Sequence, residues 1–152
     1  MIRLFFEDNG SDHDDLVLEF PGGKLRCDSY YMAIAFDAID ENINHSRLRK
    51  ALRSLLVQFS GVVEEAGDID TLHLPFDLSD QYTGWIRCTF DRSHVQIDIG
   101  WSRLEGYAID LKNIRRVVRD VSDFRAYADS AQFETNRSEL VEAIQANITS
   151  LT

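Results

Sequence analysis

The fold is decided by the stretch Trp85-Ile86-Arg87-Cys88-Thr89-Phe90-Asp91-Arg92-Ser93-His94-Val95-Gln96-Ile97-Asp98-Ile99. Its last five residues alternate apolar with polar side chains, as a strand does when only one of its faces is buried. Its first six residues are a second strand candidate, and the polar residues 91–94 can turn the chain between the two. The stretch therefore predicts an antiparallel hairpin at the centre of the fold.

Toward the N-terminus, three further short apolar runs predict a small meander of strands. They cover residues 2–6, 16–20 and 24–27. Asn9-Gly10 lies in the polar loop after the first run, and Pro21-Gly22-Gly23 separates the second from the third. Both are strong turn signals, so the first quarter of the chain is expected to be β-structure.

Three segments have apolar residues at the spacing of three and four that is typical of amphipathic helices. The first follows Ser29, a possible N-cap, and runs to Ile43. The second follows Ser46 and ends near Gly61 or Gly67. The third begins at Asn136, which has capping-box spacing to Glu139.

The remaining segments are less regular. Residues 71–75 suggest an edge strand, because Pro75 cannot donate to a ladder, and 106–110 suggest another strand. Residues 111–121 fit a helix by spacing and a strand by their β-branched content, and we favour the helix; 123–134 are expected to be irregular. The sequence thus predicts one α+β domain over residues 1–152, with a mainly antiparallel sheet of about five or six strands packed against two central helices and a C-terminal helix.

Net charge is the most distinctive global property. The chain has 16 Lys and Arg against 26 Asp and Glu, which gives a net charge of −10. A field of this sign repels nucleic acid and anionic membranes and attracts basic proteins. Only two cysteines occur, and no apolar run resembles a signal peptide or a membrane span, so we expect a cytoplasmic protein without a disulfide framework.

The charges are also segregated. Residues 4–23 and 54–86 contain no Lys or Arg but many carboxylates, and we call them the first and second acidic stretches. Half of the basic residues lie in two short pieces, 47–53 and 112–119. This pattern predicts acidic loops or edges beside basic helix faces.

No catalytic, metal or cofactor motif is recognisable. The acidic loop after Asp8 does not have EF-hand spacing, because its glycine falls third rather than sixth. Gly22-Gly23-Lys24 lacks the spacing of a Walker loop, and there is no Gly-x-Ser-x-Gly or His-Glu-x-x-His. We therefore predict no catalytic residue, no cofactor and no metal ligand.

Two segments, 77–85 and 100–107, mix acidic with aromatic residues, a combination that can hold Lys or Arg side chains. The first hypothesis is a non-catalytic module that binds a basic protein, such as an immunity-type inhibitor of a basic toxin or nuclease. Its predicted contacts are Asp12, Asp14, Asp15, Asp77, Asp80, Tyr82 and Trp85. The alternative for the large aromatic residues is a purely structural role as core anchors.

Two other hypotheses stay open. One is a small enzyme with a site assembled from scattered residues, for which the candidates are His73, Asp77, Asp80, Cys88 and His94. The other is a structural subunit of a homo-oligomer with an apolar interface. The sequence does not determine the oligomeric state.

Overall fold

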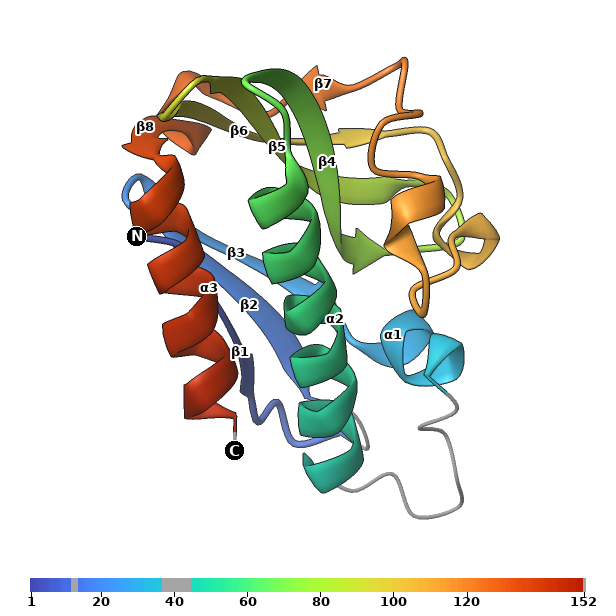
Figure 1. The fold of residues 1–152 in the computed structure, drawn as a ribbon. Helices are drawn as coiled ribbons and strands as arrows, with labels where there is room; N and C mark the ends of the chain where they lie inside the picture. The colour runs from blue at the N-terminus through green and yellow to red at the C-terminus, as the bar shows by residue number, and fades with distance from the viewer. Residues whose placement is uncertain (12–13, 37–44, 152) are drawn as a thin grey trace.

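The computed structural model describes residues 1–11, 14–36 and 45–151 and has the α+β architecture expected from the sequence (Figure 1). In these ranges the strands form two antiparallel sheets, of three and five strands. The smaller sheet has the order β1 (Arg3–Glu7), β2 (Asp15–Phe20), β3 (Gly23–Asp28). The larger sheet has the order β4-β5-β6-β7, with β8 also paired to β6; its members are β4 (Ile69–Leu78), β5 (Thr83–Asp91), β6 (His94–Ser102), β7 (Arg125–Ala126) and β8 (Gln132–Asn136).

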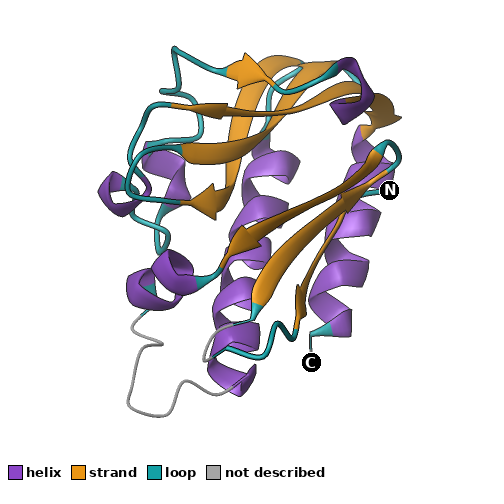
Figure 2. Cartoon of the chain, turned by 180° about the vertical axis from the view of Figure 1, so that it is seen from behind, coloured by secondary structure: helices purple, strands orange, loops and turns teal. Residues whose placement is uncertain are grey.

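Helices follow each sheet in the chain. They are α1 (Tyr30–Ala35), α2 (His45–Glu65) and α3 (Arg137–Ser150), with short 3₁₀ turns η1 (Gly106–Ala108), η2 (Ile114–Arg116) and η3 (Asp129–Ala131). The long helices α2 and α3 lie side by side over one face of the smaller sheet, as both views show (Figures 1 and 2). One hydrophobic cluster joins these helices to the inner faces of both sheets.

The predicted hairpin is confirmed. β5 and β6 pair antiparallel from Thr83–Ser102 to Asp91–His94, and the turn contains Arg92 with a positive φ of 57°. β4 continues the sheet on the other side of β5, and it is an edge strand in the sheet order, as Pro75 predicted. The three N-terminal strands are confirmed as well.

The predicted helices are present with different ends. Ser29 precedes α1, but its hydroxyl donates to the Asp14 carbonyl oxygen at 2.6 Å instead of capping the helix. The continuation predicted through Ile43 lies partly outside the described residues. α2 begins at His45, so Ser46 is inside it, and it passes through Gly61.

The C-terminal helix and its cap are confirmed. The Asn136 side chain accepts a hydrogen bond from the Glu139 amide at 2.9 Å. One turn from the other end, Asn147 accepts from the Leu4 amide and donates to the Leu4 carbonyl, both at 2.7 Å. The Asn147 side chain thus pairs with the backbone hydrogen-bonding groups of Leu4 at the outer edge of β1, and it holds α3 against the smaller sheet.

The expected strand at 106–110 is wrong, and so is the helix at 111–121. The Gly106 amide donates to Ser79 at 2.7 Å, and the chain turns there as η1. Beyond it, residues 111–121 contain only the 3₁₀ turn η2 and run along the edge of β4, where Val118 accepts from the His73 amide at 2.8 Å. Their apolar spacing arises because one side of an irregular segment faces the core.

Residues 123–134, expected to be irregular, contribute β7 and the start of β8 to the larger sheet. This pairing depends on the tertiary position of β6, and the polar local sequence does not signal it. In the part of the chain that the structure describes, none of the helices has both the length and the apolar character needed to cross a membrane.

Candidate functional site

A row of three carboxylates crosses the outer face of the smaller sheet. Leu16 and Leu18 of β2 point into the core, so their neighbour Asp15 points to the opposite face. Asp15 is directly opposite Glu7 of β1 and Asp28 of β3. Side chains that are directly opposite on adjacent strands share a face, so the three residues form what we call the acid row. Like charges in this arrangement oppose sheet formation.

Asp77, a carboxylate of the larger sheet, lies near Asp28 of the acid row. It follows a register shift in β4 between Pro75 and Asp77, and only 8% of its surface is exposed. Burial raises the pKa of its carboxyl to about 6, and the nearby charge of Asp28 acts in the same direction. The nearby Tyr82 and Cys27 side chains oppose this rise. Asp77, from the second acidic stretch, is thus close enough to be influenced by the charge of Asp28 at the end of β3.

The Cys27 thiol lies on the core side of β3, because Cys27 is directly opposite Leu16, and it donates to the Phe76 carbonyl oxygen at 3.8 Å. Burial, followed by the charges of Asp77, Asp28 and Asp15, raises its pKa far above the ordinary value. The thiolate is the nucleophilic form of cysteine, and this surrounding strongly disfavours it.

Beside Asp77 is a pocket of about 550 Å³, which we call the aromatic pocket. Its walls come from the β4–β5 loop, the end of β6 and the residue after β7. They are Gln81, Tyr82, Trp101, Arg103 and Tyr127. A Cβ atom on Gly100 would collide with the Arg125 carbonyl, so this glycine lets β7 cross β6 closely enough to place Tyr127 beside Trp101.

Asp77 lies near two tyrosines of the pocket. Burial, together with the nearby Asp77 carboxylate, raises the pKa of the Tyr82 phenol to about 12. Burial and the charge of Asp77 also raise the pKa of Tyr127. Both tyrosines therefore lie near Asp77, which is buried and is not among the described lining residues of the pocket.

The predicted contact residues do not all lie on one surface. Asp77 and Tyr82 lie near each other, Asp15 lies on the outer face of the smaller sheet, and Asp80 is exposed near Tyr107, whose pKa it helps to raise. Asp14, Asp77 and Trp85 are all buried, with 5%, 8% and 0% of their surface exposed, so they offer little contact surface; the Trp85 indole donates to Ser102 at 2.8 Å. Asp12 lies outside the described residues.

Several site residues were missed from the sequence. Trp101 and Arg103 belong to the segment 100–107, which the mixture of acidic and aromatic residues had indicated. Asp28 needed the strand register to place it opposite Asp15. Tyr127 lies in a segment expected to be irregular, and no sequence signal identified it.

The scattered candidates for an enzyme site do not converge. Cys88 is fully buried on the core side of β5, whereas His73 pairs with Arg87 and faces the other side. The His73 imidazole packs against Trp85 and Phe124, and burial lowers its pKa, which is the environment of a neutral structural histidine. His94 is exposed at the β5–β6 turn.

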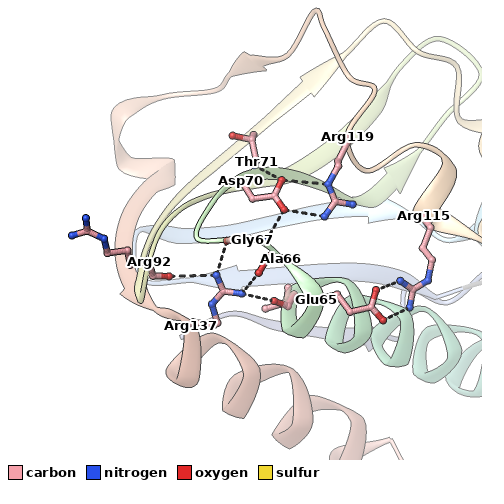
Figure 3. A network of polar contacts seen from close by, with 10 residues as sticks. Glu65, Ala66, Gly67, Asp70, Thr71, Arg92, Arg115, Arg119 and Arg137 are labelled. Carbon is pink, nitrogen blue, oxygen red and sulfur yellow. Dashed lines mark hydrogen bonds and ion pairs between the residues drawn. The ribbon is translucent and has the colours of Figure 1, made fainter.

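Acids of the second stretch other than Asp77 are partly used inside the fold (Figure 3). Glu65 forms an ion pair with Arg115, and Asp70 with Arg119 at 2.9 Å. These arginines hold the pKa of both carboxyls below their usual range. The basic piece 112–119 therefore lies beside acidic residues as the charge pattern predicted, although it is not a helix.

Within 1–11, 14–36 and 45–151, no three His, Cys, Asp or Glu side chains are grouped as a metal site requires. No protein-family model and no curated protein matches the sequence. The structure is similar to a chain of the CdiA-CT/CdiI toxin and immunity complex from Enterobacter cloacae, with a TM-score of 0.45, 10% identity, and coverage of 99% of this chain and 98% of that chain. No site residue is transferred from this distant likeness.

Proposed function

We propose that this chain is a non-catalytic module that binds a basic protein, and that the acid row with the adjoining aromatic pocket is its recognition surface. In its more specific form, the proposal is an immunity-type inhibitor that neutralises a basic toxin or nuclease. The single observation that supports it best is the register of Glu7, Asp15 and Asp28 across three neighbouring strands.

This arrangement is costly for a free protein. Carboxylates directly opposite one another repel, and the cost is about 0.2–1 kcal/mol for each such pair. Arg26 offsets part of it through an ion pair with Glu7 at 3.0 Å. A cationic surface would relieve the remaining repulsion, so binding such a partner exploits the charges that folding alone would avoid.

The test uses a variant that removes charge but keeps each hydrogen-bond acceptor. Asp15 accepts from the Asn9 side chain, and Asp28 accepts from the Tyr30 amide. Asparagine can serve both donors, so Asp15→Asn/Asp28→Asn should fold normally. The matched control is Asp91→Asn/Asp120→Asn, which removes the same charge at exposed positions outside the acid row.

Tagged wild-type protein and both variants are used to capture partners from a lysate of the native cell. We expect a basic protein that wild type and control retain and that the acid-row variant loses. With the purified partner, the association rate of the acid-row variant should be about tenfold lower at low salt, and the difference should shrink at high salt. A partner that binds the acid-row variant as fast as wild type would contradict the proposal.

The inhibitor form has a test of its own. If the partner is a toxin, producing it should arrest growth, and co-producing the wild-type chain should restore growth more effectively than the acid-row variant does. A captured partner that does not affect growth would limit the proposal to protein binding. The homo-oligomer stays a hypothesis, which the mass of the purified protein in solution would test.

A further inference from the structure

The aromatic pocket has a chemistry different from that of the acid row. Three of its five walls are aromatic rings, those of Tyr82, Trp101 and Tyr127, and the other two are Gln81 and Arg103. Arg103 is thus the charged residue of the lining, and its charge is positive. Large aromatic and arginine side chains are typical of the pockets that receive binding hot spots.

A second cation, Arg125, lies beside the Trp101 ring, although it is not among the described lining residues of the pocket. The Arg125 guanidinium is 5.6 Å from the centre of the Trp101 ring, within cation–π distance. Two guanidinium groups would repel a third one brought by a ligand, whereas both can interact favourably with the face of an added ring. The pocket lining therefore favours a neutral aromatic group over a Lys or Arg side chain.

The surroundings of the pocket favour positive charge. Asp80 directly precedes the wall residue Gln81, and its charge, together with that of Glu105, raises the pKa of Tyr107. On the other side, burial and the charge of Asp77 raise the pKa of the wall residue Tyr82. Basic residues on either side of an aromatic anchor would therefore meet carboxylates.

We infer that the aromatic pocket binds an aromatic side chain of the basic partner, flanked in the partner by Lys or Arg residues. This inference rests on the proposed function for the partner but assigns the pocket separately from the acid row. The ring would pack against Trp101 and Tyr127, and the flanking cations would face Asp80 and the acid row.

The chain contains two tryptophans, which makes a direct test possible. Trp101 lines the pocket, whereas Trp85 is fully buried and serves as an internal reference for the fold. The indole N–H signals of ¹⁵N-labelled protein are followed while Ac-Lys-Phe-Lys-NH₂ is added. Ac-Lys-Leu-Lys-NH₂ and Ac-Lys-Arg-Lys-NH₂ are the comparison peptides.

The Phe peptide should shift the Trp101 signal and leave the Trp85 signal in place. Its affinity should exceed that of the Leu peptide by roughly three- to tenfold, as expected for stacking of aromatic rings. Tyr127→Ala should abolish that advantage. Tyr30→Ala, which removes a tyrosine of similar exposure from α1 (41% against 44%), should leave it unchanged.

Two results would overturn the inference. One is tighter binding of the Arg peptide than of the Phe peptide, and the other is saturable binding of the Phe peptide without a shift at Trp101. Neither result bears on the acid row, which is tested by the Asp15→Asn/Asp28→Asn variant. If that variant loses the captured partner while Tyr127→Ala retains it at full affinity, the proposed function stands and the pocket assignment fails.

Discussion

Asp77 is a buried carboxyl near the proposed recognition surface, in a position that is unfavourable for folding. Its carboxylate is almost completely buried, although the nearby Tyr82 and Cys27 side chains favour its charged form. The rise of its pKa means that burial, reinforced by the nearby charge of Asp28, outweighs the effect of these two side chains. Burial of this carboxyl therefore comes at the expense of stability.

This cost predicts a pH dependence. The pKa of Asp77 is about 6 in the folded chain, against an ordinary value of 3.8, so the native state binds a proton that the unfolded chain has released. The free energy of unfolding should therefore fall as the pH rises through this interval, by up to about 3 kcal/mol. Asp77→Asn should remove most of this decrease in urea unfolding measured across the interval.

Asp80→Asn is the matched control, because Asp80 is exposed three positions further along the chain. Its unfolding free energy should follow the wild-type pH profile. An equally steep decrease in Asp77→Asn would show that another group is responsible.

Among the secondary-structure elements, α2 is capped at its C-terminal end by a side chain from a distant part of the sequence. Its last carbonyl groups have no partners within the helix. The Arg137 guanidinium, from the start of α3, donates to the carbonyl oxygens of Ala66 at 2.6 Å, Val63 at 3.2 Å and Gly67 at 2.8 Å (Figure 3). It also lies 4.7 Å from the Phe90 ring centre, so one side chain joins α2, α3 and β5.

Arg137→Met should keep the aliphatic packing and lose these hydrogen bonds. We expect the free energy of unfolding to decrease by about 2–3 kcal/mol, because buried carbonyl groups lose a charged donor at a helix C-terminus. Arg53→Met, at an exposed position of α2, should change it by less than about 0.5 kcal/mol. Equal effects in urea unfolding would contradict the capping role.

The secondary-structure elements also show which parts of the fold could be predicted from local sequence. The hairpin β5–β6 was predictable because alternation and a polar turn act between neighbours in the chain. The helix expected at 111–121 does not form, although the apolar residues there have helical spacing. Hydrogen bonds with the Gln58 side chain hold the backbone of this segment in another conformation. The Gln58 side chain donates to the Leu111 carbonyl at 2.5 Å and accepts from the Ile114 amide at 3.0 Å. Such long-range hydrogen bonds leave no local trace.

At the scale of the whole molecule, the charge of −10 is distributed unevenly in space. Glu65 and Asp70 are paired with arginines, whereas Asp15 and Asp28 are aligned with further acids. The paired groups contribute to structure near the end of α2. The outer face of the smaller sheet carries these aligned acids together with Arg3, Lys24 and Arg26, of which Lys24 and Arg26 form ion pairs with Glu19 and Glu7.

This uneven distribution predicts that the acid row lowers the stability of the free protein while it favours the proposed binding of a basic partner. Asp15→Asn/Asp28→Asn should raise the free energy of unfolding at low salt by about 0.5–1 kcal/mol, because it removes repulsion between opposite positions. The gain should diminish as salt increases, since exposed charges are then screened. Urea unfolding at several salt concentrations measures both effects. A variant that is less stable than wild type at low salt would show that the acid row is not repulsive.

The sequence by itself determined the α+β class, the central hairpin, the C-terminal helix with its Asn136 cap, and the strongly acidic character. These properties depend on residues close together in the chain or on composition alone. Only the tertiary structure decided which acids converge, since strand register places Asp15 opposite Asp28, and which aromatic residues stay accessible, since Trp85 is buried and Trp101 lines the pocket. The physical reason is that register and burial depend on contacts between residues far apart in the sequence, for which a single chain carries no local signal.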